Sequence, residues 1–211
     1  MSFQRNFIVL LFVRNKEQIM KQVLIINGHP DKKSFSNALS DAYIKGANKT
    51  NATLTQINIR DLEFNPNLKF GYRKRLELEL DLVDAIDKIK KADHIVWIFP
   101  IWWYGYPALM KGFIDRTFLP GITFQPIKGK PSPEKLLKGK SARLIITADT
   151  PKWYDFLIMK RPAINQFKKE TLQFCGINPV KTAYITPINN SSLDARNKWL
   201  KKVIKLGEKL K

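Results

Sequence analysis

Apolar runs typical of buried strands alternate along this chain with segments of helical periodicity. The strand-like runs are 22–27, 53–59, 94–99, 142–147 and 180–186. The helix-like segments are 36–48, 72–91, 107–118, one that carries Ile164, Phe167, Thr171 and Phe174 and ends near Gly176, and one from 192. Strands that alternate with helices pair in parallel, because each helix carries the chain back across the sheet. The sequence therefore predicts one α/β domain, a three-layer sandwich with a five-stranded parallel sheet and helices on both faces.

The segment 1–19 precedes the first of these strands and contains the apolar stretch "FIVLLFV" at 7–13. This stretch is too short to span a bilayer, and "RNKEQ" follows it in place of a small-residue cleavage site. Met20 comes directly before the first strand, so we expect 1–19 to be an extension from an upstream start codon. An additional edge strand is the alternative. The domain itself is expected to cover 20–211.

The chain carries 37 Lys and Arg residues against 18 Asp and Glu residues, a formal net charge of +19. Such a charge suits nucleic acid, a membrane surface or an anionic small molecule. Both signs are mixed within 72–91, and the sequence has no zinc-ligand spacing or RNA-binding signature. We favour a lysine-rich surface, with attraction of phosphate-bearing small molecules as the alternative. The single cysteine, Cys175, excludes an intrachain disulfide and indicates the cytoplasm, and we expect it to be buried at a helix end.

Ligands of open parallel sheets bind beyond the carboxyl ends of the strands, and three segments are expected to meet there. They are "NGHPDKKSFSN" at 27–37, "PIWWYGYP" at 100–107 and "TADTPKWY" at 147–154. Ser34, Ser36 and Asn37 are residue types that cap helix N-termini, where free N–H groups and the helix dipole attract anions. The first segment therefore predicts a phosphate site, with ordinary helix capping as the alternative.

The second segment places Trp102, Trp103 and Tyr104 between Pro100 and Gly105, in a loop and not in a periodic stripe. Aromatic rings gathered in a loop suit a planar ligand that stacks on them. A cluster that merely fills the core is the alternative interpretation.

Three stretches, "VLIINGHPDKKSFSNAL", "ADHIVWIFPIWWYGYPALMKGFIDRTF" and "FCG", resemble the NAD(P)H:quinone oxidoreductases, the DT-diaphorase-like group of flavodoxin-fold reductases. Bacterial relatives of this kind are NADPH-quinone reductases or modulators of drug activity. The resemblance runs from about Lys21 to the C-terminus. It implies a flavodoxin-like fold with strand order 2-1-3-4-5, a non-covalently bound FAD or FMN, NAD(P)H as co-substrate, and a homodimer with the active site at the subunit interface.

The resemblance also implies the residues that hold the flavin. The phosphate and ribityl side would be held by His29, Ser34, Phe35, Ser36 and Asn37, and the isoalloxazine would be wrapped, largely through backbone contacts, by Pro100, Ile101, Trp102, Trp103, Tyr104 and Gly105. The third segment would meet the ring through Thr147, Ala148, Asp149 and Thr150, where animal members carry Thr-Thr-Gly-Gly. Trp102 stands where relatives have a glutamine, so any polar contact made there is lost.

Animal members also place a histidine after the third segment, whereas the only histidines of this chain are His29 and His94. Some group must offset the negative charge that develops around N1 and O2 of the reduced ring. We predict Tyr154 as a hydroxyl donor and Lys152 as a cationic alternative, although Lys152 is equally expected as a solvated surface lysine. Asp149 would accept a hydrogen bond from flavin N3, or would cap its own loop.

The expected function is two-electron, ping-pong hydride transfer from NAD(P)H to a quinone or a similar planar acceptor. The excursion 119–140 would supply a wall of the site or a dimer contact. An ancillary flavoprotein of a potassium-efflux system is an alternative, because members of this family have that role. A flavodoxin-like electron carrier fits less well, since such carriers tend to be acidic, and a nucleic-acid-binding protein is the least favoured class. No membrane insertion is expected.

Overall fold

The computed structural model describes residues 20–210, so the expectation for 1–19 lies outside the described residues. Five parallel strands form its central sheet: β1 (Gln22–Asn27), β2 (Thr53–Asn58), β3 (His94–Pro100), β6 (Ser141–Thr147) and β7 (Val180–Ile185). Their order is β2-β1-β3-β6-β7. Since β4 and β5 belong to a separate hairpin, this is the predicted order 2-1-3-4-5, and the flavodoxin-like fold is confirmed.

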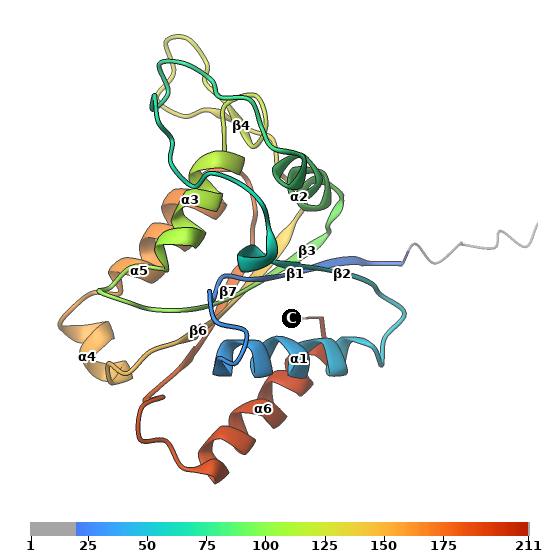
Figure 1. The fold of residues 1–211 in the computed structure, drawn as a ribbon, viewed down its shortest axis with the longest axis vertical. Coiled ribbons are helices and arrows are strands. Elements are labelled where there is room, and N and C mark those ends of the chain that lie inside the picture. The colour runs from blue at the N-terminus through green and yellow to red at the C-terminus, as the bar shows by residue number, and fades with distance from the viewer. Residues whose placement is uncertain (1–19, 211) are drawn as a thin grey trace, which may run out of the picture.

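Helices cover both faces of the sheet, as Figure 1 shows. One face packs against α1 (Phe35–Ala47) and α6 (Leu193–Glu208), and the other against α2 (Leu80–Lys91), α3 (Ala108–Thr117), α5 (Pro162–Asn165) and the π-helix η2 (Gln166–Gln173). The short elements are η1 (Ile59–Asp61), β4 (Phe124–Gln125), β5 (Glu134–Lys135) and α4 (Lys152–Leu157). The predicted three layers are therefore present.

Alternate side chains of each central strand enter different cores, which explains why these strands are apolar throughout. Leu24 and Ile26 of β1 join the cluster beneath α2 and α3, whereas Val23 and Ile25 join the cluster beneath α1 and α6. All four are essentially inaccessible to solvent. A side chain of this size contributes about 1.5–3 kcal/mol when fully buried, so the sheet is held from both sides.

Helices α1 and α6 approach each other closely through two glycines. A Cβ atom at Gly46 would overlap the carbonyl oxygen of Ile204, and one at Gly207 would overlap the carbonyl oxygen of Tyr43. Only residues without a side chain allow this backbone-to-backbone contact, so it fixes the position of α6 against α1.

The helix predicted over 72–91 begins only at Leu80, so the first part of that prediction is wrong. The buried guanidinium of Arg116 binds the Glu77 carbonyl oxygen at 3.0 Å and the Glu79 carboxylate at 2.7 Å. Glu79 itself is extended (ψ 151°) and accepts the N–H of Asn65. These tertiary contacts hold the preceding residues out of the helix.

The helix predicted around Ile164 to Phe174 is present as α5 continued by η2. Gly176 follows it with φ +107°, a positive value that glycine adopts without strain and that is common just after a helix, so the predicted end of the helix is confirmed. Helix α4 was not predicted. Two residues with positive φ, Lys160 and Arg161, separate α4 from α5. Cys175 is buried, as expected.

Candidate functional site

A cleft of about 150 Å³ opens at the carboxyl ends of the central strands, the left edge of the sheet in Figure 1. All three segments singled out in the sequence contribute to it. Its lining residues are His29, Phe35, Ser36, Pro100, Ile101, Trp102, Thr147, Ala148, Asp149 and Ile188. Backbone hydrogen bonds tie the first segment to β3, from Gly28 N–H to the Ile98 carbonyl oxygen, and the second segment to the third, from Ile101 N–H to the Thr147 carbonyl oxygen, each at 2.8 Å.

The N-terminus of α1 faces this cleft. Ser34 is the N-cap residue, and its hydroxyl oxygen accepts the N–H of Asn37 at 3.3 Å. The first N–H groups of a helix have no partner within the helix and attract anions. Ser36 lines the cleft, is only 1% exposed, and its Oγ has no hydrogen-bond partner among the described residues. A buried hydroxyl without a partner is unfavourable, so this end of the cleft suits an oxygen-rich anionic ligand.

His29 presents a neutral imidazole with a defined tautomer. The N–H of Asp31 donates to His29 Nδ1 at 2.9 Å, so the ring proton resides on Nε2. Burial lowers the pKa of His29 below its usual 6.5. The nearby Arg60 also lowers this pKa, whereas Asp31 raises it without cancelling the effect of burial. The ring also meets the edge of Trp102 at a centroid distance of 5.5 Å. His29 can therefore donate a hydrogen bond from Nε2.

A two-residue turn carries the aromatic side chains of the second segment. Trp102 and Gly105 exchange two backbone hydrogen bonds of 2.9 Å, and the residues between them, Trp103 and Tyr104, have φ values of +51° and +55°. Bulky residues avoid this left-handed region, which costs about 1–2 kcal/mol per residue. The N–H groups of Ile101 and Trp102 are already bonded within the chain, so these residues can meet a flat ligand through their side chains but not through those groups.

The third segment is held by the loop that follows β7. Ile188 N–H donates to the Ala148 carbonyl oxygen at 3.2 Å, and Asn189 N–H donates to the Asp149 carboxylate. One oxygen of Asp149 therefore caps this loop. Ile188 was missed by sequence reasoning, since nothing in "TPINNSS" distinguishes it from an ordinary loop residue.

Several predicted residues do not line the cleft: Ser34, Asn37, Trp103, Tyr104, Gly105, Thr150, Lys152 and Tyr154. Trp103 is fully exposed, and Tyr154 lies in α4 with 38% of its surface exposed. Asn37 is engaged within the chain, where its Oδ1 accepts a hydrogen bond from Arg60 at 3.1 Å. The single chain thus brings nine of the fifteen predicted cofactor contacts to the cleft, and the predicted catalytic pair, Lys152 and Tyr154, lies outside it.

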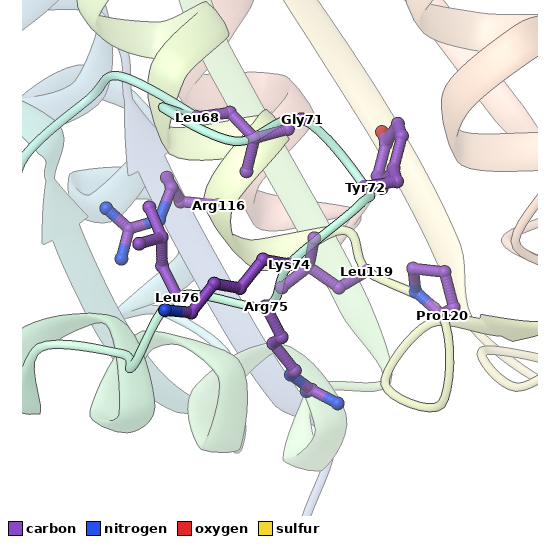
Figure 2. A pocket seen from close by; sticks show the side chains of 9 residues that line it. All are labelled: Leu68, Gly71, Tyr72, Lys74, Arg75, Leu76, Arg116, Leu119 and Pro120. Atoms are coloured by element: carbon purple, nitrogen blue, oxygen red, sulfur yellow. The ribbon is translucent and has the colours of Figure 1, made fainter.

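A second cavity, of about 190 Å³, lies at the opposite end of α3, between the loop 68–76 and residues 116–120 (Figure 2). Both terminal nitrogens of Arg116 are hydrogen bonded to the chain, and the Lys74 ammonium lies over the Phe70 ring. The Arg75 guanidinium extends away from the cavity in Figure 2. The walls of this second cavity are mainly apolar, and none of the three segments singled out in the sequence contributes to it, so we assign the functional site to the cleft at the carboxyl ends of the strands.

Comparison with known families agrees with this geometry. A family model described as flavodoxin-like fold matches residues 21–206. The chain belongs to this family. Among curated proteins, mouse ribosyldihydronicotinamide dehydrogenase [quinone] is 27% identical to this chain over 208 residues. The alignment covers 85% of this chain and 87% of the mouse protein. The chain is thus a distant homologue of the quinone oxidoreductases, and the resemblance read from the sequence is confirmed.

Solved structures also superpose on the chain over most of its length. The Smu.1420 protein of Streptococcus mutans UA159 shares 30% identity, with a TM-score of 0.77 over 89% of this chain and 99% of that protein. An NAD(P)H:quinone oxidoreductase from Methanothermobacter marburgensis shares 20% identity, with a TM-score of 0.76 over 90% and 97% of the two chains. The second likeness shows the fold alone. Within residues 20–210, no helix combines the length and the apolar character needed to cross a bilayer.

Proposed function

We propose that the chain is a cytoplasmic, flavin-dependent NAD(P)H oxidoreductase that reduces quinones or similar planar acceptors by two-electron, ping-pong hydride transfer. The buried Ser36 hydroxyl at the N-terminus of α1, which has no partner among the described residues, is the observation that carries the proposal. It lies in a cleft whose other walls are largely apolar or aromatic. This combination suits a flat ring system with a phosphorylated tail, so the residues present fit FAD or FMN.

A bound flavin would supply the redox chemistry, accepting a hydride from NAD(P)H and passing it to the acceptor. The protein would orient it. Ser36 and the first N–H groups of α1 would bind the phosphate, and His29 would donate a hydrogen bond from Nε2. Pro100, Ile101 and Trp102 would pack along the ring and exclude water from that side.

The negative charge of the reduced ring needs donors that are already in place. The N–H groups of Asp149 and Thr150 have no hydrogen-bond partner among the described residues, and their loop is fixed because the Thr150 carbonyl oxygen accepts the Thr186 hydroxyl at 2.7 Å. We assign these two N–H groups the stabilising role first. Tyr154 and Lys152 remain proposals that require α4 or a partner subunit to bring them closer.

A homodimer is part of the proposal. Helix α4 and the residue that follows it expose a group of large apolar side chains beside the cleft, each more than half exposed: Trp153, Phe156, Leu157 and Ile158. Trp103 is exposed at the neighbouring turn. An exposed apolar surface of this kind is typical of an interface and rare on a monomer. A partner subunit covering it would deepen the open cleft.

The proposal is tested by reconstituting the purified protein with FAD and with FMN. We expect a stable yellow complex that NADPH bleaches and that a benzoquinone restores, with parallel double-reciprocal plots. Ile188→Trp should fill the cleft and abolish flavin binding, whereas an aliphatic-to-tryptophan exchange at Val83, exposed on α2 and away from the cleft, should leave flavin binding unchanged. A protein that binds neither flavin, or plots that intersect, would refute the proposed cofactor or the ping-pong scheme respectively.

A further inference from the structure

One cation beside the cleft is not explained by the fold. Arg60 follows β2 in η1, and only 9% of its side chain is exposed. Its Nε and one terminal nitrogen are buried and have no hydrogen-bond partner among the described residues. The other terminal nitrogen donates to Asn37 Oδ1 at 3.1 Å. A buried guanidinium normally has most of its five N–H groups bonded, because desolvating them costs free energy.

The neighbours of Arg60 only partly balance its charge. The Asp61 carboxylate lies 3.5 Å from Nε, but 60% of that side chain is exposed, so water screens it. Asn37 is neutral and is bonded in turn to Asp41. His29 is kept neutral, in part by Arg60 itself. The first turn of α1 carries no acidic residue.

The position of Arg60 connects this charge to the cleft. Asn37 belongs to the first turn of α1, the same turn that places Ser36 in the cleft. Through its hydrogen bond to Asn37, Arg60 therefore adds a full positive charge next to the N-terminus of α1, whose N–H groups and dipole already favour an anion. An anion bound there offsets a cation that is otherwise costly to bury, and a neutral ligand does not.

We infer that Arg60 makes the cleft selective for a phosphorylated flavin over its neutral counterpart. The inference rests on the proposed function, and it names the phosphate as the recognised group. Arg60 acts as a positioning residue, because it holds Asn37 and supplies the field at the end of α1 without lining the cleft. FMN and riboflavin differ in that phosphate alone, so they isolate its contribution.

The test titrates apoprotein with FMN and with riboflavin, following quenching of flavin fluorescence. In Arg60→Met we expect the affinity for FMN to fall about tenfold, equivalent to about 1.4 kcal/mol, while the affinity for riboflavin changes less than twofold. Arg60→Lys should retain most of the preference, because it keeps the charge. The control is Lys45→Met, which removes the same charge at the far end of α1 and should leave both affinities unchanged.

If both flavins bind but Arg60→Met leaves their ratio as in the wild type, the inference is wrong and the proposed function stands. An equal loss in Lys45→Met means that net charge alone is responsible, and this also overturns it. A wild-type protein that binds neither flavin refutes the proposed function and the inference with it.

Discussion

The positive φ of Trp103, in the turn beside the cleft, is expected to lower the stability of the fold, and this cost can be measured. Trp103 has φ +51°, and its side chain is fully exposed in the single chain, so replacing it in the monomeric protein forfeits no buried surface. Asparagine tolerates the left-handed region better than tryptophan. Since that region costs about 1–2 kcal/mol for a bulky residue, Trp103→Asn should raise the free energy of unfolding by about 0.5–1 kcal/mol. For a domain of this size the midpoint of thermal unfolding should rise by about 1–4 °C.

The assay is urea unfolding of the apoprotein, followed by circular dichroism. The protein is diluted until the unfolding midpoint no longer depends on its concentration, which ensures that the monomer is measured. Trp153→Asn is the matched control, because it makes the same exchange at an exposed position inside helix α4. There asparagine relieves no strain, and the partial loss of apolar contact should make that variant neutral or slightly less stable. Equal shifts in the two variants, or a less stable Trp103→Asn, would refute the strain argument.

Three further outcomes are expected. Gly207→Ala should lower the free energy of unfolding by roughly 2–3 kcal/mol in a urea titration, because its Cβ would overlap the Tyr43 carbonyl oxygen; an unchanged midpoint would show that α6 can move away. Burial and nearby cations lower the pKa of His94 to about 4, so its folded form binds fewer protons than the unfolded chain, and the stability present above pH 6.5 is lost as the pH falls. Between pH 7 and pH 5 the wild type should lose about 2 kcal/mol more than His94→Gln, and parallel pH profiles would contradict this. His29→Ala should weaken FMN binding about tenfold through loss of one hydrogen-bond donor, as measured by fluorescence quenching, and an unchanged affinity would exclude the Nε2 contact.

The sequence predicts the sheet well because the relevant signal is local. The runs at 22–27 and 94–99 are apolar throughout, and both of their faces are covered in the structure. The three segments that form the cleft could also be found, since parallel strands all end at one edge. Glycine at 176 likewise marked the end of its helix, at φ +107°.

Features created by contacts between distant residues could not be read in this way. The late start of α2 depends on Arg116, which lies 37 residues beyond Glu79 in the chain. Arg60 resembles any surface arginine in the sequence, and only the fold buries it beside α1. Ile188 enters the cleft because its N–H pairs with Ala148, 40 residues earlier.

The close contact of α1 with α6 makes the site depend on the last part of the chain. The loop that carries Ile188 and donates the Asn189 N–H to Asp149 lies between β7 and α6, so it is anchored at both ends only while α6 stays docked through Gly207. A stop codon just before Leu193 would remove no cleft residue, yet it would release one wall of the cleft and uncover the apolar face of α1. Such a shortened protein should therefore both aggregate and lose its ligand, although every residue that lines the cleft is still present.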